Sequence, residues 1–398
     1  MDDDTVTLGD RIRKRRGKLY SQEKLAERAG VSVILIRKLE QNQRQTASIP
    51  SLQKIARALD VSVADLLDKP RSMPQAEENA GVVAIRHALT PVDDFTDDAA
   101  DDESVSLENA GRSVKYMWGA YWAGKYEELG RLIPPALNQL RATYRDATTG
   151  DRPKAARLLA YGYQVAGDTL VHLGQQDLAF YGVREALRVA RDGDDPLLYE
   201  SIKLSMSWQL LVQGRFEESE NVATVAAHGI EPNGKVGDSQ LSLYGLFTVT
   251  AATAAARALK RDATNDLIAI SQETAKRLGY ERADHSTTFG PTKVAMLTVD
   301  SHIVQDNFTE ALTAAKGLRG HADALPLASR ARHLADTAFA HMRVGHTEKA
   351  LNLMLAADSM AADWMQVQVF PKQIVRELLT HERPTRLREL AARLGVVN

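Results

Sequence analysis

The sequence contains no cysteine, which excludes a disulfide framework, a thiolate metal site and a cysteine nucleophile. It also lacks the run of about 18 apolar residues that a transmembrane helix needs. The nearest stretch, residues 246–259, is broken by threonines and contains Arg257. The N-terminus, MDDDTVTLGD, has neither the basic nor the apolar region of a secretory signal. We therefore expect a cytoplasmic protein without membrane contact.

What the sequence does contain is an uneven distribution of charge. Its 398 residues leave room for two or three domains, and 44% hydrophobic with 26% charged residues is close to the soluble globular average. Residues 1–70 hold 14 basic and 10 acidic side chains, residues 71–110 hold 2 and 10, and residues 111–398 hold 34 and 32. A basic segment followed by an acidic one favours a nucleic-acid contact followed by a spacer.

Residues 1–68 are rich in the patterns that begin and end short helices. A capping box opens the first helix at Thr7, and Ser21 and Ser32 are each placed to cap another. Gly30 permits a tight turn between the second and third helices because it has no Cβ. A proline at the start of a further apolar stripe, and a short capped segment after it, indicate two more helices. The sequence therefore predicts a compact domain of five helices.

The segment SQEKLAERAGVSVILIRKLEQ has the pattern of two short helices joined by a glycine-containing turn, which is typical of a helix-turn-helix. Residues 8–67 resemble the phage-repressor-type (Xre) helix-turn-helix family. The family's pattern is matched at Ser21, Gln22, Leu25, Ala26, Gly30, Val31, Ser32, Ile36, Leu39 and Glu40. The resemblance implies a DNA-binding domain in which Gln22 and the start of its helix contact phosphates. It further implies contacts to base edges and backbone from Val33, Ile34, Arg37 and Lys38.

Val33 and Ile34 stand where many members of that family carry Gln, Asn or Thr. Apolar side chains cannot read a pattern of donors and acceptors, although they can pack against a thymine methyl group. The alternative is that they pack within the domain or against a partner subunit. We therefore expect hydrogen-bonded base readout from Arg37 and Lys38, with DNA shape contributing.

The basic residues near this motif predict contacts to the DNA backbone. Residues 8–44 hold 11 basic and 4 acidic side chains, which favours phosphate contact over a merely solvated helix face. One such domain buries too little surface for tight specific binding, so we expect a homodimer on operator half-sites about 34 Å apart. The candidate DNA-binding residues are Arg13, Arg15, Arg16, Ser21, Gln22, Ser32, Val33, Ile34, Arg37, Lys38 and Arg44.

Residues 69–106 read as an acidic linker, with several prolines and the run DDFTDDAADDES. A short helix is predicted inside it over residues 82–89. The aspartates do not match a calcium loop, because they come in pairs without the central glycine and the closing glutamate. A second hypothesis is that this acidic segment competes with DNA for the basic helices. Unchanged DNA affinity and salt dependence after deletion of residues 93–103 would contradict it.

Residues 107–398 predict an α-solenoid. A local motif recurs there, with glycine, an aromatic or turn residue two positions on and a small or apolar residue five positions on, in strong and weaker copies. Its copies, spaced by 39 to 50 residues, indicate about six helix pairs that resemble divergent tetratricopeptide repeats with long helices. Residues 383–397 are expected to cap the array. Because alternating strand patterns are scarce, the expected fold class is all-α. The copies begin at Gly124, Gly174, Gly214, near Lys260, and at Asp306 and Gly345.

A helix-turn-helix domain joined to such an array resembles bacterial regulators that sense a peptide or small molecule on the concave face of the array. Residues 285–294, HSTTFGPTKV, are similar to a family of such regulators from high-GC bacteria. We expect polar and aromatic residues on the first helix of each repeat to bind the effector, the alternative being that they pack between helices. A buried cation needs a partner, which here indicates an anionic ligand or a peptide carboxylate. The candidate ligand residues are Trp118, Tyr121, Trp122, Gln164, Trp208, Tyr244, Thr292, Lys293 and Arg330.

The sequence gives little indication of phosphate binding, metal binding or catalysis. Residues 229–236 match the start of a phosphate-binding loop but end in valine where a hydroxyl is needed, and follow a helix pattern, so they predict an inter-helix loop. No nucleophile with a base, no metal-ligand spacing and no cofactor motif is found. The sequence predicts a dimeric, effector-controlled transcription regulator that is not an enzyme. The alternative is an interaction scaffold or antitoxin-like adaptor controlled by a partner protein. A scaffold predicts an open apolar groove, whereas an effector predicts an enclosed pocket.

Overall fold

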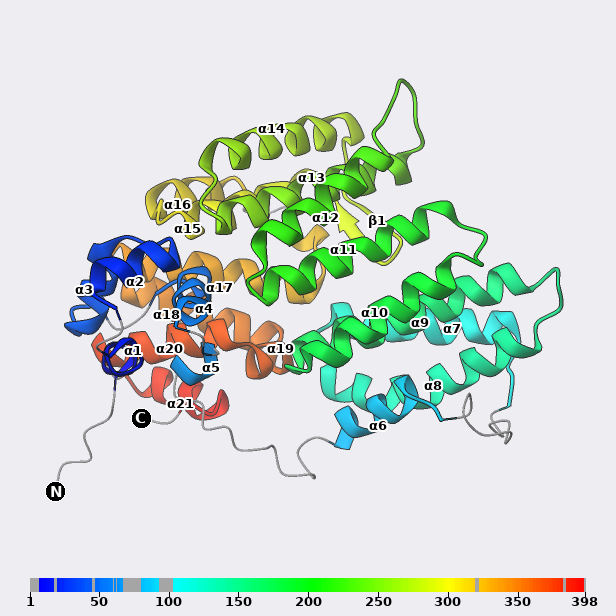
Figure 1. The fold of residues 1–398 in the computed structure, drawn as a ribbon, viewed down its shortest axis with the longest axis horizontal. Helices are drawn as coiled ribbons and strands as arrows, with labels where there is room; N and C mark the ends of the chain where they lie inside the picture. The colour runs from blue at the N-terminus through cyan, green and yellow to red at the C-terminus, as the bar shows by residue number, and fades with distance from the viewer. Residues whose placement is uncertain are drawn as a thin grey trace.

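A computed structural model describes residues 7–17, 20–44, 47–59, 61, 63–66, 80–92, 103–318, 322–381 and 384–396. The described chain is mostly helical, as predicted, with a small N-terminal domain beside a long helical array (Figure 1). The N-terminal domain lies against the C-terminal helices, and the first repeats form the opposite end of the molecule (Figure 1). No helix within these ranges is both long and apolar enough to cross a bilayer.

The N-terminal domain has the five predicted helices. Thr7 caps the first one in a reciprocal capping box with Asp10, and Gly30 ends the second in the left-handed conformation. Its core contains fully buried leucines and isoleucines from the first four helices. The helices are α1 (Leu8–Arg16), α2 (Gln22–Ala29), α3 (Val33–Glu40), α4 (Ile49–Ala58) and α5 (Val63–Leu66).

Six helix pairs form the array, as predicted. The first four are α7 (Leu107–Trp122) with α8 (Tyr126–Asp146), α9 (Arg152–His172) with α10 (Gln176–Ala190), α11 (Pro196–Val212) with α12 (Phe216–Gly229), and α13 (Asp238–Arg257) with α14 (Arg261–Leu278). The last two are α15 (Pro291–Val304) with α16 (Phe308–Lys316), and α17 (Leu327–Arg343) with α18 (Thr347–Met360).

The turn inside each pair repeats one geometry. One residue takes a positive φ, and the next N–H bonds back to the carbonyl five residues earlier, which ends the first helix as a Schellman motif. The fourth copy has its left-handed residue at Leu259, one position before the Lys260 used as register point. The left-handed residues are Gly124, Gly174, Gly214, Leu259, Asp306 and Gly345.

Part of the predicted linker is folded. The helix expected over residues 82–89 is α6 (Ala80–Leu89), and it packs on α8 through buried apolar side chains such as Ile85. Gly81 and Gly130 let the two backbones approach closely. Helix α6 therefore belongs to the array and not to a solvated spacer. The acidic run 93–102, with the competition hypothesis attached to it, lies outside the described residues.

Sequence analysis missed a small β-hairpin between α14 and α15. Strands β1 (Arg282–Asp284) and β2 (Thr287–Phe289) pair antiparallel through a turn in which His285 and Ser286 both have positive φ. The strands are three residues each and too short to show alternation. Residues 231–237, in contrast, form the predicted loop between two helices.

Three helices complete the chain. The last of them corresponds to the predicted capping helix, and its apolar face is buried through Leu387 and Leu390. They are α19 (Ala362–Val367), α20 (Val369–His381) and α21 (Thr385–Arg393).

Candidate DNA-binding surface and candidate ligand cavity

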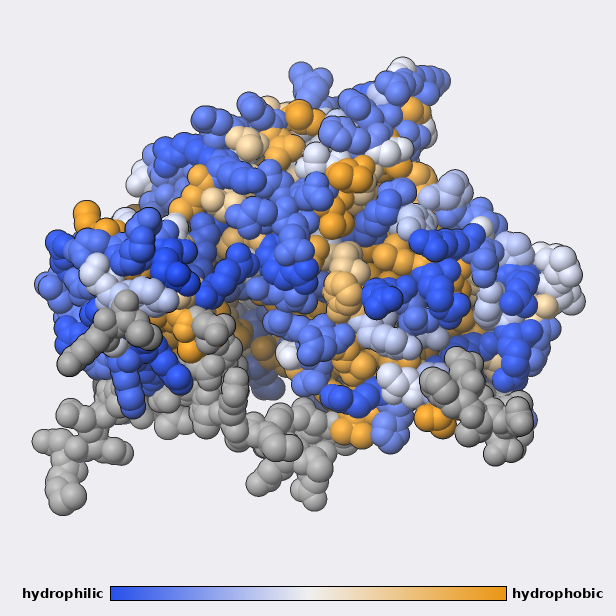
Figure 2. All heavy atoms as spheres, viewed as in Figure 1, coloured by the Kyte–Doolittle hydropathy of each residue, from blue (hydrophilic) through white to orange (hydrophobic). Residues whose placement is uncertain are grey.

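Helix α3 presents one face to the core of its domain and the other to solvent. Ser32 caps it, while Ile36 and Leu39 are fully buried. Arg37 and Lys38 are exposed on the opposite face, and the Arg37 guanidinium lies 3.7 Å from the exposed carboxylate of Glu23. In Figure 1, α3 lies at the outer edge of the molecule, and the visible surface there is mainly hydrophilic (Figure 2). The predicted reading face is therefore accessible.

Val33 and Ile34 differ in environment. Val33 is half-buried against the core of the domain, as in the packing alternative. Ile34 is 62% exposed. An exposed isoleucine on a recognition helix is available for contact with a thymine methyl group.

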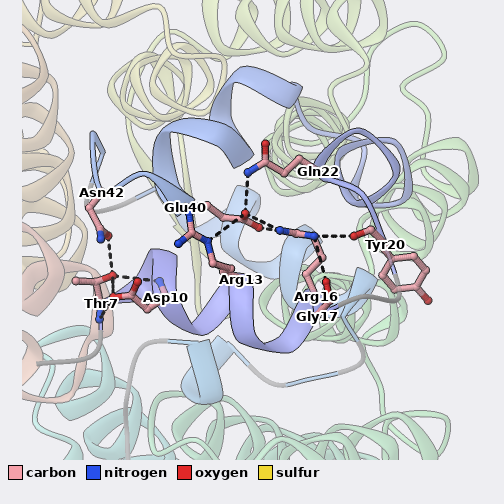
Figure 3. Close-up of polar contacts among 9 residues, drawn as sticks. All are labelled: Thr7, Asp10, Arg13, Arg16, Gly17, Tyr20, Gln22, Glu40 and Asn42. Atoms are coloured by element: carbon pink, nitrogen blue, oxygen red, sulfur yellow. Dashed lines mark hydrogen bonds and ion pairs between the residues drawn. The ribbon is translucent and has the colours of Figure 1, made fainter. Parts of the chain in front are cut away.

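A buried carboxylate organises the helix-turn-helix (Figure 3). Glu40, at the end of α3, accepts hydrogen bonds from Arg16 Nε (2.7 Å) and Arg16 Nη2 (2.9 Å), and from Gln22 Nε2 (2.7 Å). Burial alone would raise the pKa of Glu40, but the hydrogen bonds from Arg16 and Gln22 outweigh it and hold this pKa below its usual value. The two predicted DNA contacts, Arg16 and Gln22, thus tie α1 and α2 to α3.

The other predicted DNA-binding residues fall into three groups. Arg13 and Arg15 are exposed on α1, and the Arg13 guanidinium also approaches Glu40 at 3.9 Å. Ser21 and Ser32 cap α2 and α3. Arg44 is directed toward the array, where its guanidinium lies 3.8 Å from Asp306 and burial lowers its pKa.

Besides the contact of Arg44 with Asp306, hydrogen bonds fix the N-terminal domain to the array at two places. On one side, Gln53 Nε2 of α4 donates to the carbonyl of Val212 (2.6 Å), and Arg57 donates to the carbonyl of Gly214. On the other side, Gln373 Nε2 of α20 donates to the carbonyl of Ala47 (2.8 Å). The first anchor is the turn between α11 and α12, and the second is the C-terminal part of the array.

A cavity of about 370 Å³ lies between the first helices of successive repeats. The turn of the β-hairpin contacts two other parts of the array beside this cavity. Trp122 Nε1, at the end of α7, donates to the carbonyl of Ser286 (3.2 Å), and His285 Nε2 lies 3.0 Å from Asp195, directly before α11. Six of the predicted ligand residues line this cavity: Trp118, Tyr121, Trp122, Gln164, Trp208 and Lys293.

The other three predicted ligand residues do not line it. Arg330 pairs with the exposed Asp323. Tyr244 packs against a separate core cluster, and the backbone N–H of Thr292 donates to Glu281. All three are on the predicted first helices, but a helix has only one inward face, and these side chains are on other faces.

One end of the cavity is aromatic. The centroid of the His172 ring lies 4.4 Å from the ring centroid of Tyr126 and 5.1 Å from that of Trp208. Burial lowers the pKa of His172 to about 3, so its ring is neutral at physiological pH. Gln368 Nε2 lies 2.8 Å from its Nδ1 and the Tyr121 hydroxyl 3.3 Å from its Nε2, which assigns the ring proton to Nε2.

The other end carries charges that sequence analysis mostly missed. Asp300 accepts hydrogen bonds from both Nη atoms of Arg257 (2.8 and 3.1 Å) and from Nη2 of Arg332 (3.1 Å). The Nε of Arg332 donates to Asp336 (2.8 Å). Burial raises the pKa of Asp336 to about 6. Within the described part of the chain, Lys293 has no hydrogen bond or ion pair. Burial lowers its pKa to about 8, so it remains largely charged at neutral pH.

The side of the cavity between these ends is polar. Asp168 accepts a hydrogen bond from the hydroxyl of Ser205 (2.8 Å), and burial raises its pKa to about 7. Two buried polar atoms there have no partner among the described residues: Trp118 Nε1 and Gln164 Oε1. Buried polar groups are normally hydrogen-bonded, so these atoms indicate a site that a ligand or water completes. Charged residues on the inward face of first helices would have been the sequence pattern to search for.

Comparison with known proteins identifies the N-terminal domain. A helix-turn-helix family model matches residues 12–66. The HTH-type transcriptional regulator SinR of Bacillus subtilis is 43% identical over 63 residues, and its Bacillus licheniformis counterpart is 41% identical over 63. Each match covers 16% of this chain and 57% of the relative, so the chain spans little more than half the length of the curated relatives it matches.

Two solved structures are similar to larger parts of the chain. BtubC (BKLC) from P. vanneervenii is 17% identical with a TM-score of 0.39, covering 70% of this chain and 92% of its own. A Rap protein complexed with Competence and Sporulation Factor is 13% identical with a TM-score of 0.45, covering 92% and 90%. Similarity at this level does not transfer a ligand or partner. Residues 12–66 are therefore a helix-turn-helix domain similar to that of SinR, joined in this chain to a helical repeat array.

Proposed function

We propose that this protein is a DNA-binding transcription regulator whose repeat array binds an effector. The observation that carries the proposal is that Arg37 and Lys38 are exposed on the outer face of α3, while α4 holds the domain on the array. An α-helix with exposed cations can lie in the major groove and donate to guanine. The array would supply a homodimer, which places two such helices on two half-sites.

The size and lining of the cavity support an effector site. Its volume, about 370 Å³, is within the usual range for sites of small molecules, and its walls combine aromatic surface with a few polar groups. The effector is accordingly a small molecule or a short part of a peptide.

Val212 supplies a physical route from the cavity to the DNA-binding domain. It lines the cavity, and its carbonyl accepts the hydrogen bond from Gln53 of α4. Gln368 also lines the cavity, directly before α20, which holds Ala47 through Gln373. A ligand that favours one arrangement of these helices would thereby favour one position of the domain.

The test is DNA binding by Arg37→Ala and Lys38→Ala after an operator has been selected from random duplexes. Each substitution should weaken operator binding by roughly 1–3 kcal/mol and random-duplex binding much less, because base contacts specify and phosphate contacts do not. Arg112→Ala, which removes an exposed arginine from α7, is the matched control and should have no effect. Equal losses on operator and random DNA would exclude base readout by α3.

A further inference from the structure

We infer that the effector of the proposed regulator is a small amphipathic anion, with a flat apolar body against the aromatic end of the cavity and one acidic group near Lys293. The inference rests on the proposed effector function and adds the chemical class of the ligand. It is carried by one unpaired cation, one aromatic wall and a set of buried polar atoms without partners.

The charges at the polar end leave one cation unpaired. Arg257 and Arg332 are held by Asp300 and Asp336 in four hydrogen bonds. The Lys293 ammonium, in contrast, has no ion pair among the described residues, and Glu281 and Asp300 influence it only at longer range. Placing a charge in a poorly solvated site is costly unless it is paired. One carboxylate, sulfonate or phosphate on a ligand would provide that partner.

The aromatic part of the cavity lining suits a flat apolar group. Trp122, Trp208 and Trp364 line it, and the neutral imidazole of His172 lies between the rings of Tyr126 and Trp208. Aromatic walls bury large apolar area and favour stacked or edge-on contact with another ring.

A cationic ligand is the less favourable occupant. Aromatic rings attract cations, but Asp168, a carboxylate of the cavity lining, has a pKa of about 7 and is therefore only partly charged at neutral pH. An anion is compatible with a protonated Asp168, which can donate a hydrogen bond. Trp118, which also lines the cavity, has a further buried donor without a partner among the described residues, its Nε1.

The experiment compares two probes of nearly the same shape. 8-Anilino-1-naphthalenesulfonate has an aromatic body and one sulfonate, and N-phenyl-1-naphthylamine lacks the sulfonate. In fluorescence titrations of the full chain without DNA, the sulfonate probe should bind at one site. Lys293→Met should weaken its binding at least tenfold and change binding of the neutral probe less than threefold. Lys293→Arg should retain most of the affinity for the sulfonate, which keeps the test valid if Lys293→Met does not fold.

Matched controls separate the site from general dye binding. Lys115→Met removes the same charge from an exposed position on α7 and should leave both titrations unchanged, whereas Trp208→Ala should weaken both probes. Equal sulfonate affinity in wild type and Lys293→Met, or binding that does not saturate at one site, would overturn the inference. Because the titrations contain no DNA, that result would not contradict the proposed DNA-binding function. Conversely, a failed operator-binding test of Arg37→Ala would not contradict the inferred anionic ligand.

Discussion

Asp168 shows how one buried residue sets a pH dependence. Burial raises the pKa of its carboxyl from the ordinary value of 3.8 to about 7, so the folded protein holds a proton that the unfolded chain has lost. Its contribution to stability therefore falls as pH rises from about 4 to about 7 and stays constant above that range. The residue lies on α9 beside Ser205 and lines the cavity.

We predict that Asp168→Asn is more strongly stabilising at pH 8 than at pH 5, because at pH 5 wild type has lost only part of the stability that it loses by pH 8. Asparagine resembles the protonated acid, so the variant should gain up to about 4 kcal/mol over wild type at the higher pH. Thermal unfolding at the two pH values measures the effect. Asp177→Asn, at an exposed position on α10, is the control and should show no such difference. Equal melting shifts at pH 5 and pH 8 would contradict the assignment.

The turn inside each helix pair depends on the backbone conformation of one residue. Six equivalent turns need a left-handed residue, and four use glycine. Leu259 takes φ 63° instead, with its side chain 53% exposed, so it carries a conformational cost with little burial in return. Leu259→Gly should therefore raise the free energy of unfolding by about 0.5–1 kcal/mol.

The matched substitution in the same turn geometry is Gly174→Ala. No heavy atom lies within 4 Å of the Cβ it would add, so only the backbone conformation opposes it. It should lower stability by about 1 kcal/mol. Urea unfolding followed by circular dichroism measures both variants. A shift of both midpoints in the same direction would show that the left-handed turn is not the cause.

Attachment of the DNA-binding domain is a property of the whole molecule. Gln53 and Arg57 hold it on the turn between α11 and α12. The double variant Gln53→Ala/Arg57→Ala removes this anchor and leaves the contacts of Ala47 and Arg44 in place, so it should weaken the coupling of the domain to the array and move the domain's calorimetric transition to lower temperature. Glu27→Ala, at an exposed position on α2, should leave the wild-type profile. An unchanged profile in the double variant would mean that the two hydrogen bonds do not couple the domains.

Local patterns in the sequence were enough to predict the N-terminal domain and the turns of the array. A capping box at Thr7, serine caps at Ser21 and Ser32 and a left-handed glycine at Gly30 act over three or four residues, so each is readable from the chain alone. The exposed face of α3 followed from the same periodicity.

Only the tertiary structure decided which cations are exposed. Arg16 is held by Glu40 and Arg44 lies near Asp306, whereas Arg37 remains exposed, although all three are arginines near one motif. The charged end of the cavity joins Arg257 and Asp300, which are on different helices. Such pairs form because the array places distant helices side by side. Sequence determines the helices, since their causes are local, and the fold determines the site, because its residues meet only after the helices have packed.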